Sequence, residues 1–91
     1  STMETYQVQL VLINKFGEFK GKPADIDEEK YDNLIKMSRT FYASGGFELT
    51  CEDDSYAIFP PNIVEESILI INKKTITGDE SVEEGDKNVQ E

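Results

Sequence analysis

One capped amphipathic helix is the feature that most limits how this chain of 91 residues can fold. Asp27 is typical of a helix N-cap, and two acids, Glu28 and Glu29, follow it where the helix dipole favours negative charge. A stripe with a spacing of three and four residues comes next, and it consists of Leu34, Ile35, Ser38, Phe41 and Tyr42. Gly45 and Gly46 then supply the left-handed backbone with which helices end. The pattern predicts one helix over about residues 28–43.

Alternating apolar residues predict a strand before this helix. In residues 6–14, apolar and polar side chains alternate at first, and then both faces become apolar, which is typical of an interior strand. Residues 15–22 are rich in lysine and glycine and predict an exposed turn. This turn is expected to extend the strand into a ragged hairpin through Phe16 and Phe19, which Pro23 ends.

The second half of the chain predicts a hairpin and one further strand. Apolar residues alternate on either side of Asp53 and Asp54, and aspartate suits such a turn because it tolerates positive φ. A proline pair ends this hairpin, and residues 62–67 predict one helical turn. Residues 67–74 are apolar on both faces at first, which is typical of a strand covered on each side or central in its sheet.

Together these elements predict an α+β fold, with one helix packed on a small, mostly antiparallel sheet of about four strands. Ser1 and Thr2 precede the first methionine, as residues left by a purification tag do, so a single domain is expected over residues 3–74. Residues 75–91 contain six acids, one lysine and no aromatic residue. They predict a disordered acidic C-terminal tail, because they have little apolar surface to bury.

The cluster from Cys51 to Asp54 raises the question of a reactive site. Cys51 is expected on the same face as Phe47 and Leu49, where a thiol behaves as a small apolar group. The chain has no histidine, so it can form neither a zinc site of the usual type nor a Cys–His nucleophile. We interpret the cluster as a hairpin turn and predict no catalytic residue, no metal, no cofactor and no enzymatic activity.

The net charge of −10 directs the prediction of function. A surface this acidic repels nucleic acid and anionic membranes at long range and attracts basic proteins. The sequence therefore predicts a non-enzymatic interaction module that binds a basic protein partner, for instance by imitating nucleic acid before a nucleic-acid-binding enzyme. The predicted partner-binding residues are Asp25, Asp27, Glu28, Glu29, Asp32, Glu52, Asp53, Asp54, Glu65 and Glu66.

A single-stranded nucleic-acid-binding protein is the alternative from another functional class. Phenylalanines among lysines provide both stacking platforms and positive charge, although the net charge disfavours direct nucleic-acid binding. The residues of this alternative are Lys15, Phe16, Phe19, Lys20, Lys22, Lys73 and Lys74. The acidic tail follows the last two of these lysines, which allows it to fold back on them as an autoinhibitor.

Compartment and association follow from the cysteine count and the size. A single cysteine forms no internal disulfide, and no stretch approaches the roughly 20 apolar residues that cross a bilayer, so we expect a cytoplasmic protein with no membrane partner. A body of roughly 70 residues has a core worth only about 3–5 kcal/mol beyond its costs. We therefore expect a homodimer or an adaptor that pairs through a sheet edge, at residues 6–14 or 47–59.

Residues 30–72 resemble small accessory proteins of tailed phages. The resemblance lies in a helix that ends in an aromatic pair, the strand FELT, an acidic turn and the segment FPPNIVEESIL. It covers roughly half of the chain and includes no catalytic motif. The resemblance implies a protein made during infection, in the host cytoplasm, that binds, inhibits or recruits host or phage machinery.

Overall fold

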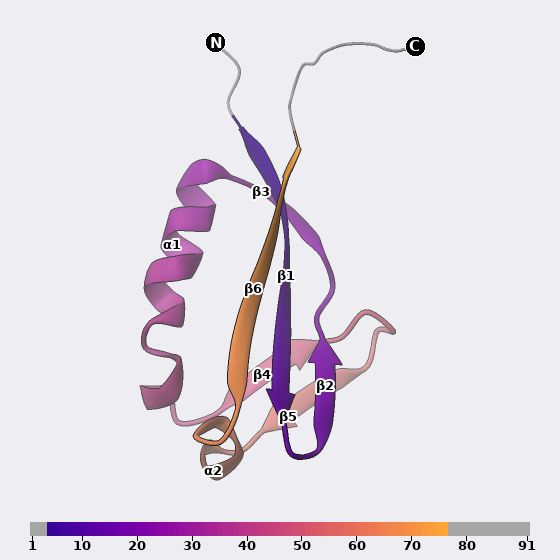
Figure 1. The fold of residues 1–91 in the computed structure, drawn as a ribbon, viewed down its shortest axis with the longest axis vertical. Helices are drawn as coiled ribbons and strands as arrows, with labels where there is room; N and C mark the ends of the chain where they lie inside the picture. The colour runs from indigo at the N-terminus through magenta and orange to yellow at the C-terminus, as the bar shows by residue number, and fades with distance from the viewer. Residues whose placement is uncertain (1–3, 77–91) are drawn as a thin grey trace.

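The computed structural model describes residues 4–76 and has an α+β architecture, with one main helix and a mostly antiparallel sheet (Figure 1). In chain order the elements are β1 (Thr5–Asn14), β2 (Gly17–Lys20), β3 (Ala24–Asp27), α1 (Glu28–Ser38), the 3₁₀ turn η1 (Phe41–Ala43), β4 (Phe47–Thr50), β5 (Tyr56–Phe59), α2 (Pro61–Val64) and β6 (Ile68–Ile76). The predicted fold class is confirmed. So are the hairpin of β4 and β5 and the short helical turn α2.

Strand β1 lies in the middle of the main sheet. β2 and β3 follow one another along one side of it, and β6 runs along the other side. The pairing with β6 continues without a bulge from Thr5 opposite Ile76 to Ile13 opposite Ile68. All of these pairs are antiparallel, so β1 finds backbone partners on both sides along most of its length.

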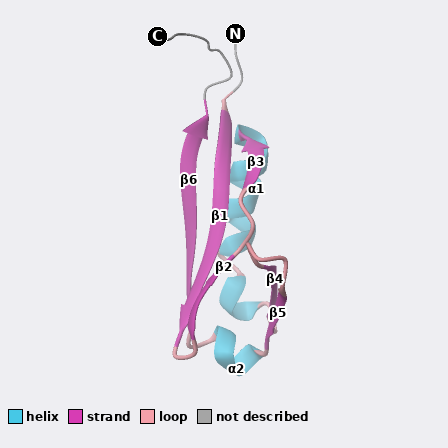
Figure 2. Ribbon diagram, turned by 90° about the vertical axis from the view of Figure 1, so that its right-hand side faces the viewer, coloured by secondary structure: helices cyan, strands magenta, loops and turns pink. Residues whose placement is uncertain are grey.

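All the other elements pack on one face of this sheet. Figure 2 shows α1, α2 and the β4–β5 hairpin on the same side, which we call the inner face, while no element of the described part of the chain covers the outer face. The core lies between the inner face and these elements, and Leu12 and Val64 are its most deeply buried side chains. The other buried members of this core are Phe41, Leu49, Cys51 and Phe59.

The β4–β5 hairpin is fastened to the junction between β2 and β3. The Lys22 amide donates to Thr50 O at 3.0 Å, and the Glu52 amide donates to Lys20 O at 3.0 Å. Gly21 lies between these bonds, and a Cβ placed there would come within 2.8 Å of a Leu49 methyl carbon. Only glycine therefore lets the hairpin approach the sheet this closely.

The α-helix begins as predicted and ends earlier. The Lys30 amide donates to the Asp27 carboxylate at 2.8 Å, which confirms the N-cap. The prediction of a helix to residue 43 is wrong, because α1 ends at Ser38 and a separate 3₁₀ turn follows. The Arg39 amide is shared between two carbonyls, and the Thr40 hydroxyl donates to Met37 O, so the last turn tightens and the chain turns towards the core.

Two strand predictions need correction. Pro23 does not end the pairing, because β3 resumes beside β1 directly after it. The strand predicted to end at residue 74 continues to Ile76, so Thr75 and Ile76 belong to the sheet rather than to the tail. The remainder of the predicted disordered tail, residues 77–91, lies outside the described residues.

The neighbours of β1 and β6 also differ from prediction. The strand at residues 6–14 has strands on both sides, which confirms the interior strand predicted from its pattern and contradicts the open edge also expected there. The last strand was expected to be covered or central, yet within residues 4–76 it pairs only with β1. The apolar side chains on its outer side therefore face solvent, as the exposed fractions of Ile68 (59%) and Ile70 (37%) show.

We predict that Leu12→Ala removes most of the stability of this domain, because Leu12 has no exposed surface. Such a truncation costs about 2–5 kcal/mol, against a total of about 3–5 kcal/mol for a body of this size. Ile58→Ala, at a side chain that is 68% exposed, is the control and should change stability by less than about 0.5 kcal/mol. Urea unfolding followed by circular dichroism measures both, and equal losses would contradict the assigned core.

Candidate functional site

The structure divides the predicted partner-binding acids among three places. One group lies on β3 and the start of α1, the second in the turn between β4 and β5, and the third directly after α2 (Figure 1). We call the first group the acidic end of the molecule. It consists of Asp25, Asp27, Glu28, Glu29 and Asp32.

The acidic end is built by the passage from β3 into α1. Asp27 is both the last residue of β3 and the helix N-cap, so the strand fixes where the first helical turn begins. Apart from half-buried Asp27, the four carboxylate residues are exposed. Lys30 is the one base between residues 25 and 32, so five acids and one base give this stretch a net charge of −5 + 1 = −4.

Carboxylates near the acidic end raise the pKa of a tyrosine beneath it. The Tyr6 hydroxyl donates to Glu4 at 2.8 Å. That hydrogen bond, burial, and the charges of Glu4, Glu28 and Asp32 raise the pKa of Tyr6 from 10.0 to about 12. The Lys73 ammonium lies 4.5 Å from the centre of the Tyr6 ring and 4.6 Å from that of Tyr31, which ties β6 to the helix.

The acids of the β4–β5 turn make contacts within the chain. Asp53 accepts hydrogen bonds from the Ser55 amide and hydroxyl, and these bonds lower the pKa of the Asp53 carboxyl. Glu52 accepts a hydrogen bond from the Gln9 side chain at 2.8 Å. Asp54, which has a positive φ of 72°, forms an ion pair with Lys22. These three acids therefore shape the predicted turn and hold it to the sheet.

The third group lies beside the β1–β2 turn. Glu66 and Lys15 form an ion pair at 3.4 Å. Both side chains are more than half exposed, so this pair contributes little to stability. The ion pair does, however, offset the charge of Glu66, one of the two carboxylates in this third group.

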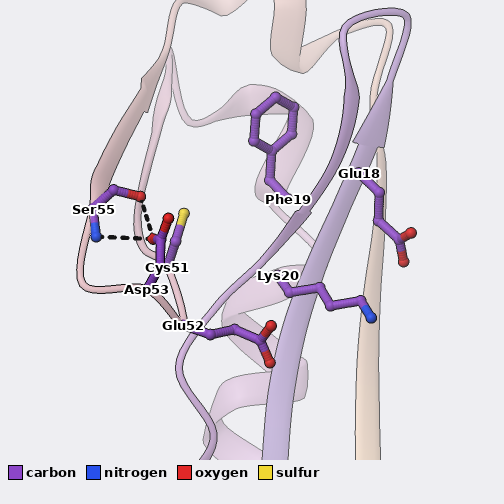
Figure 3. Close-up of a pocket in the computed structure, with 7 residues that line it drawn as sticks. All are labelled: Glu18, Phe19, Lys20, Cys51, Glu52, Asp53 and Ser55. Carbon is purple, nitrogen blue, oxygen red and sulfur yellow. Dashed lines mark hydrogen bonds between the residues drawn. The ribbon is translucent and has the colours of Figure 1, made fainter.

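Cys51 lies at an open hollow of about 560 Å³ between β2 and the hairpin turn (Figure 3). Figure 3 shows Glu18 and Lys20 pointing away from the thiol, on the other side of β2. Cys51 itself is only 9% exposed, and it belongs to the core with Leu49 and Phe59. The Cys51 thiol donates to Leu49 O at 3.9 Å, and the Asp53 carboxylate is hydrogen-bonded to Ser55.

The residues of the nucleic-acid alternative are also dispersed. Phe16 is 68% exposed, but Phe19 packs inside against Phe59, with their ring centres 5.1 Å apart. Lys15 and Lys22 are in ion pairs, and Lys73 lies over the tyrosine rings of the inner face. Lys20 and Lys74 lie on the outer face, at different positions along β1, opposite Val11 and Gln7.

An apolar surface on the outer face, which we call the outer patch, was not predicted from the sequence. Residues directly opposite one another in antiparallel strands share a face, so Val11 with Ile70 and Ile13 with Ile68 form two neighbouring pairs there. The signal was present as apolar residues on both faces of these strands. Because of this pattern, the last strand was expected to be covered on both faces or central in its sheet. Among residues 4–76, no layer covers its outer face.

Residues 4–76 have neither a cluster of metal-binding side chains nor a membrane-spanning helix. They contain no group of three or more acidic or cysteine side chains placed to hold a metal ion. The helices among them are too short and too polar to cross a bilayer. No protein-family model, curated protein or solved structure matches this chain.

We predict that Tyr6 titrates near pH 12 and that Tyr6→Phe removes this step. The pKa of Tyr6 is higher in the folded chain than in the unfolded chain, so its stabilising contribution is complete below pH 10 and is lost as pH rises to about 12. Ultraviolet absorbance of tyrosinate records the titration. The hydrogen bond that Tyr56 donates to Glu48 also raises the pKa of Tyr56, so the measurement uses a Tyr56→Phe background. In that background Tyr42→Phe is the control and should keep the step near pH 12, whose persistence in Tyr6→Phe would contradict the assignment.

We also predict that the Cys51 thiol reacts slowly in the folded protein. Its burial should slow modification by a disulfide reagent at least about tenfold relative to the chain in concentrated urea. The control combines Cys51→Ala with Ser55→Cys, which places a single thiol at an exposed turn position. A folded wild-type chain that reacts as fast as this control would show an accessible, reactive cysteine.

Proposed function

We propose that this chain is a non-enzymatic protein-interaction module that binds a basic protein through the acidic end. One observation carries the proposal. The acidic end keeps a net charge of −4 and takes part in neither of the two ion pairs found among residues 4–76. The acids of the hairpin turn, by contrast, are engaged within the chain.

The local structure fixes the backbone of the acidic end before a partner binds. β3 is paired with β1, and the helix that follows is capped, so the backbone carrying the carboxylates is held before any partner arrives. Fixed charges of one sign steer an oppositely charged partner and select its orientation. Binding at such a surface loses less conformational entropy than binding at a segment that must first be ordered.

The proposed partner class is a basic protein that normally binds nucleic acid. Carboxylates spaced along β3 and the first helical turns can occupy positions that phosphates take on such a protein. The resemblance of residues 30–72 to small phage proteins makes bacterial or phage nucleic-acid enzymes the first candidates, with inhibition or recruitment as the outcome. Direct binding of single-stranded nucleic acid has less support, since Phe19 is packed inside and the lysines are dispersed.

We predict that neutralising the acidic end abolishes capture of the partner. Immobilised full-length chain should retain one or a few basic proteins from a bacterial lysate at moderate salt, and an excess of short duplex DNA should release them. The variant with isosteric amides should retain them at least about tenfold less, because each lost charge-assisted contact weakens binding. Its substitutions are Asp25→Asn, Asp27→Asn, Glu28→Gln, Glu29→Gln and Asp32→Asn.

A charge-matched variant is the control for this experiment. It neutralises five acids between residues 79 and 86, outside the described residues, through Asp79→Asn, Glu80→Gln, Glu83→Gln, Glu84→Gln and Asp86→Asn. Both variants have a net charge of −10 + 5 = −5. Asparagine caps helices as well as aspartate does, so Asp27→Asn should leave α1 intact. Equal losses in both variants would show that only the overall charge matters and would refute a site at the acidic end.

A further inference from the structure

The outer patch is an apolar surface that the acidic end does not use. It lies on the face of the sheet that Figure 2 shows uncovered, and it exposes 59% of Ile68 and 37% of Ile70. Half-buried Ile13 extends it onto β1, whereas Val11 on the same face is only 3% exposed and adds little to it. Burial of such surface is favourable by about 25 cal/mol per Å², so a partner that covered it would gain stability.

Strand pairing orders the patch and its border into two rows. Each row begins with a charged residue on β2 and continues with an apolar residue on β1 and another on β6. The first row is Glu18, Ile13 and Ile68, and the second is Lys20, Val11 and Ile70. The rows are two residues apart along the strands and carry opposite charges.

We propose that the outer patch binds a second copy of this chain, face to face, about a two-fold axis that runs across the strands between the two rows. This axis sets the first row of each copy against the second row of the other. Ile68 of each copy then faces Ile70 of the other, and Glu18 faces Lys20 of the other copy, each at two symmetric places. The patch is thus complementary to itself, as an isologous interface requires.

The position of the acidic end also favours a second copy as the partner of the outer patch. The rows lie on the β2 half of the sheet, whereas the acidic end lies at the opposite end, where β3 meets α1 (Figure 1). Because the two-fold axis reverses the strand direction, the acidic ends of the two copies point away from each other. Their mutual repulsion is therefore least in this arrangement, and mixed charges meet at the contact.

The contact is small, so the dimer should be weak. The two rows supply six residues from each copy, against about 20–30 residues a side in a standard interface. We expect a dissociation constant of about 10–100 micromolar, which is measurable by sedimentation equilibrium of the full-length chain at physiological salt.

Charge reversal tests the proposed symmetry. Glu18→Lys and Lys20→Glu should each raise the dissociation constant at least about tenfold, because each sets like charges against one another twice. The two single variants change the net charge in opposite directions, to −10 + 2 = −8 and −10 − 2 = −12, so a loss in both cannot arise from net charge. The double variant should return the constant to within about threefold of wild type.

A second variant tests the apolar part. Ile70→Gln should also lose the dimer, and circular dichroism should show every variant folded, since the three substituted side chains are exposed. A wild-type chain that is monomeric at several hundred micromolar would overturn the inference. So would a dimer that is insensitive to the single reversals, as expected for pairing through the free edge of β6, or a double variant that does not recover.

The inference is separate from the proposed function. A monomeric chain that still captures a basic protein through the acidic end overturns only the dimer. A dimer that fails to capture any protein overturns only the proposed function.

Discussion

The position of β1 between two sets of strands is the constraint on which the rest of the structure depends. Tyr6, Val8 and Leu12 on its inner face are less than 10% exposed, and so is Val11 on its outer face, although no element among residues 4–76 covers that face. Neighbouring strands on both sides shield them, and the inner layer covers the remainder. Each later element is located by its connection to this strand: β3 leads into α1, the β2–β3 junction binds the hairpin, and α2 precedes β6.

The acidic residues illustrate how one residue type takes on different roles through its partners. In the hairpin turn, carboxylates accept backbone and side-chain hydrogen bonds and form an ion pair, so these carboxylates are already engaged in contacts within the chain. At the acidic end, α1 needs only one carboxylate for its cap. The rest of that charge remains directed at solvent, where its energetic effect depends on what approaches it. Composition alone does not distinguish these two situations.

Local signals were sufficient for part of the fold. The N-cap at Asp27, the turn at Asp53 and Asp54, and the short helix after Pro60 depend on residues close together in the chain, and the sequence predicted each of them. β3 was missed because its four residues have no pattern of their own and are held by pairing with β1. The end of α1 is set by hydroxyl groups that bond backbone carbonyls and by burial of Phe41, which a periodic pattern does not reveal.

For the candidate site, the sequence predicted which residues are acidic but not where they lie in the fold. The sequence identified the acids as one set, and the division into three places follows from strand pairing between distant residues. The both-faced apolar pattern of β6 was read as evidence of a covering layer. Periodicity records which side chains are apolar and does not record what lies opposite them, so the uncovered outer face was not predictable in this way.

The pairing of β1 with β6 also has a consequence for biosynthesis. β1 is complete at Asn14, whereas its neighbour begins at Ile68, so 68 − 14 = 54 residues of synthesis separate the two. At about 5–20 residues per second, the ribosome takes roughly 3–11 seconds to supply the missing strand. During that interval one side of β1 presents unpaired amides and carbonyls to the cell. The nascent chain is therefore most vulnerable to chaperone capture or aggregation immediately before its last strand emerges.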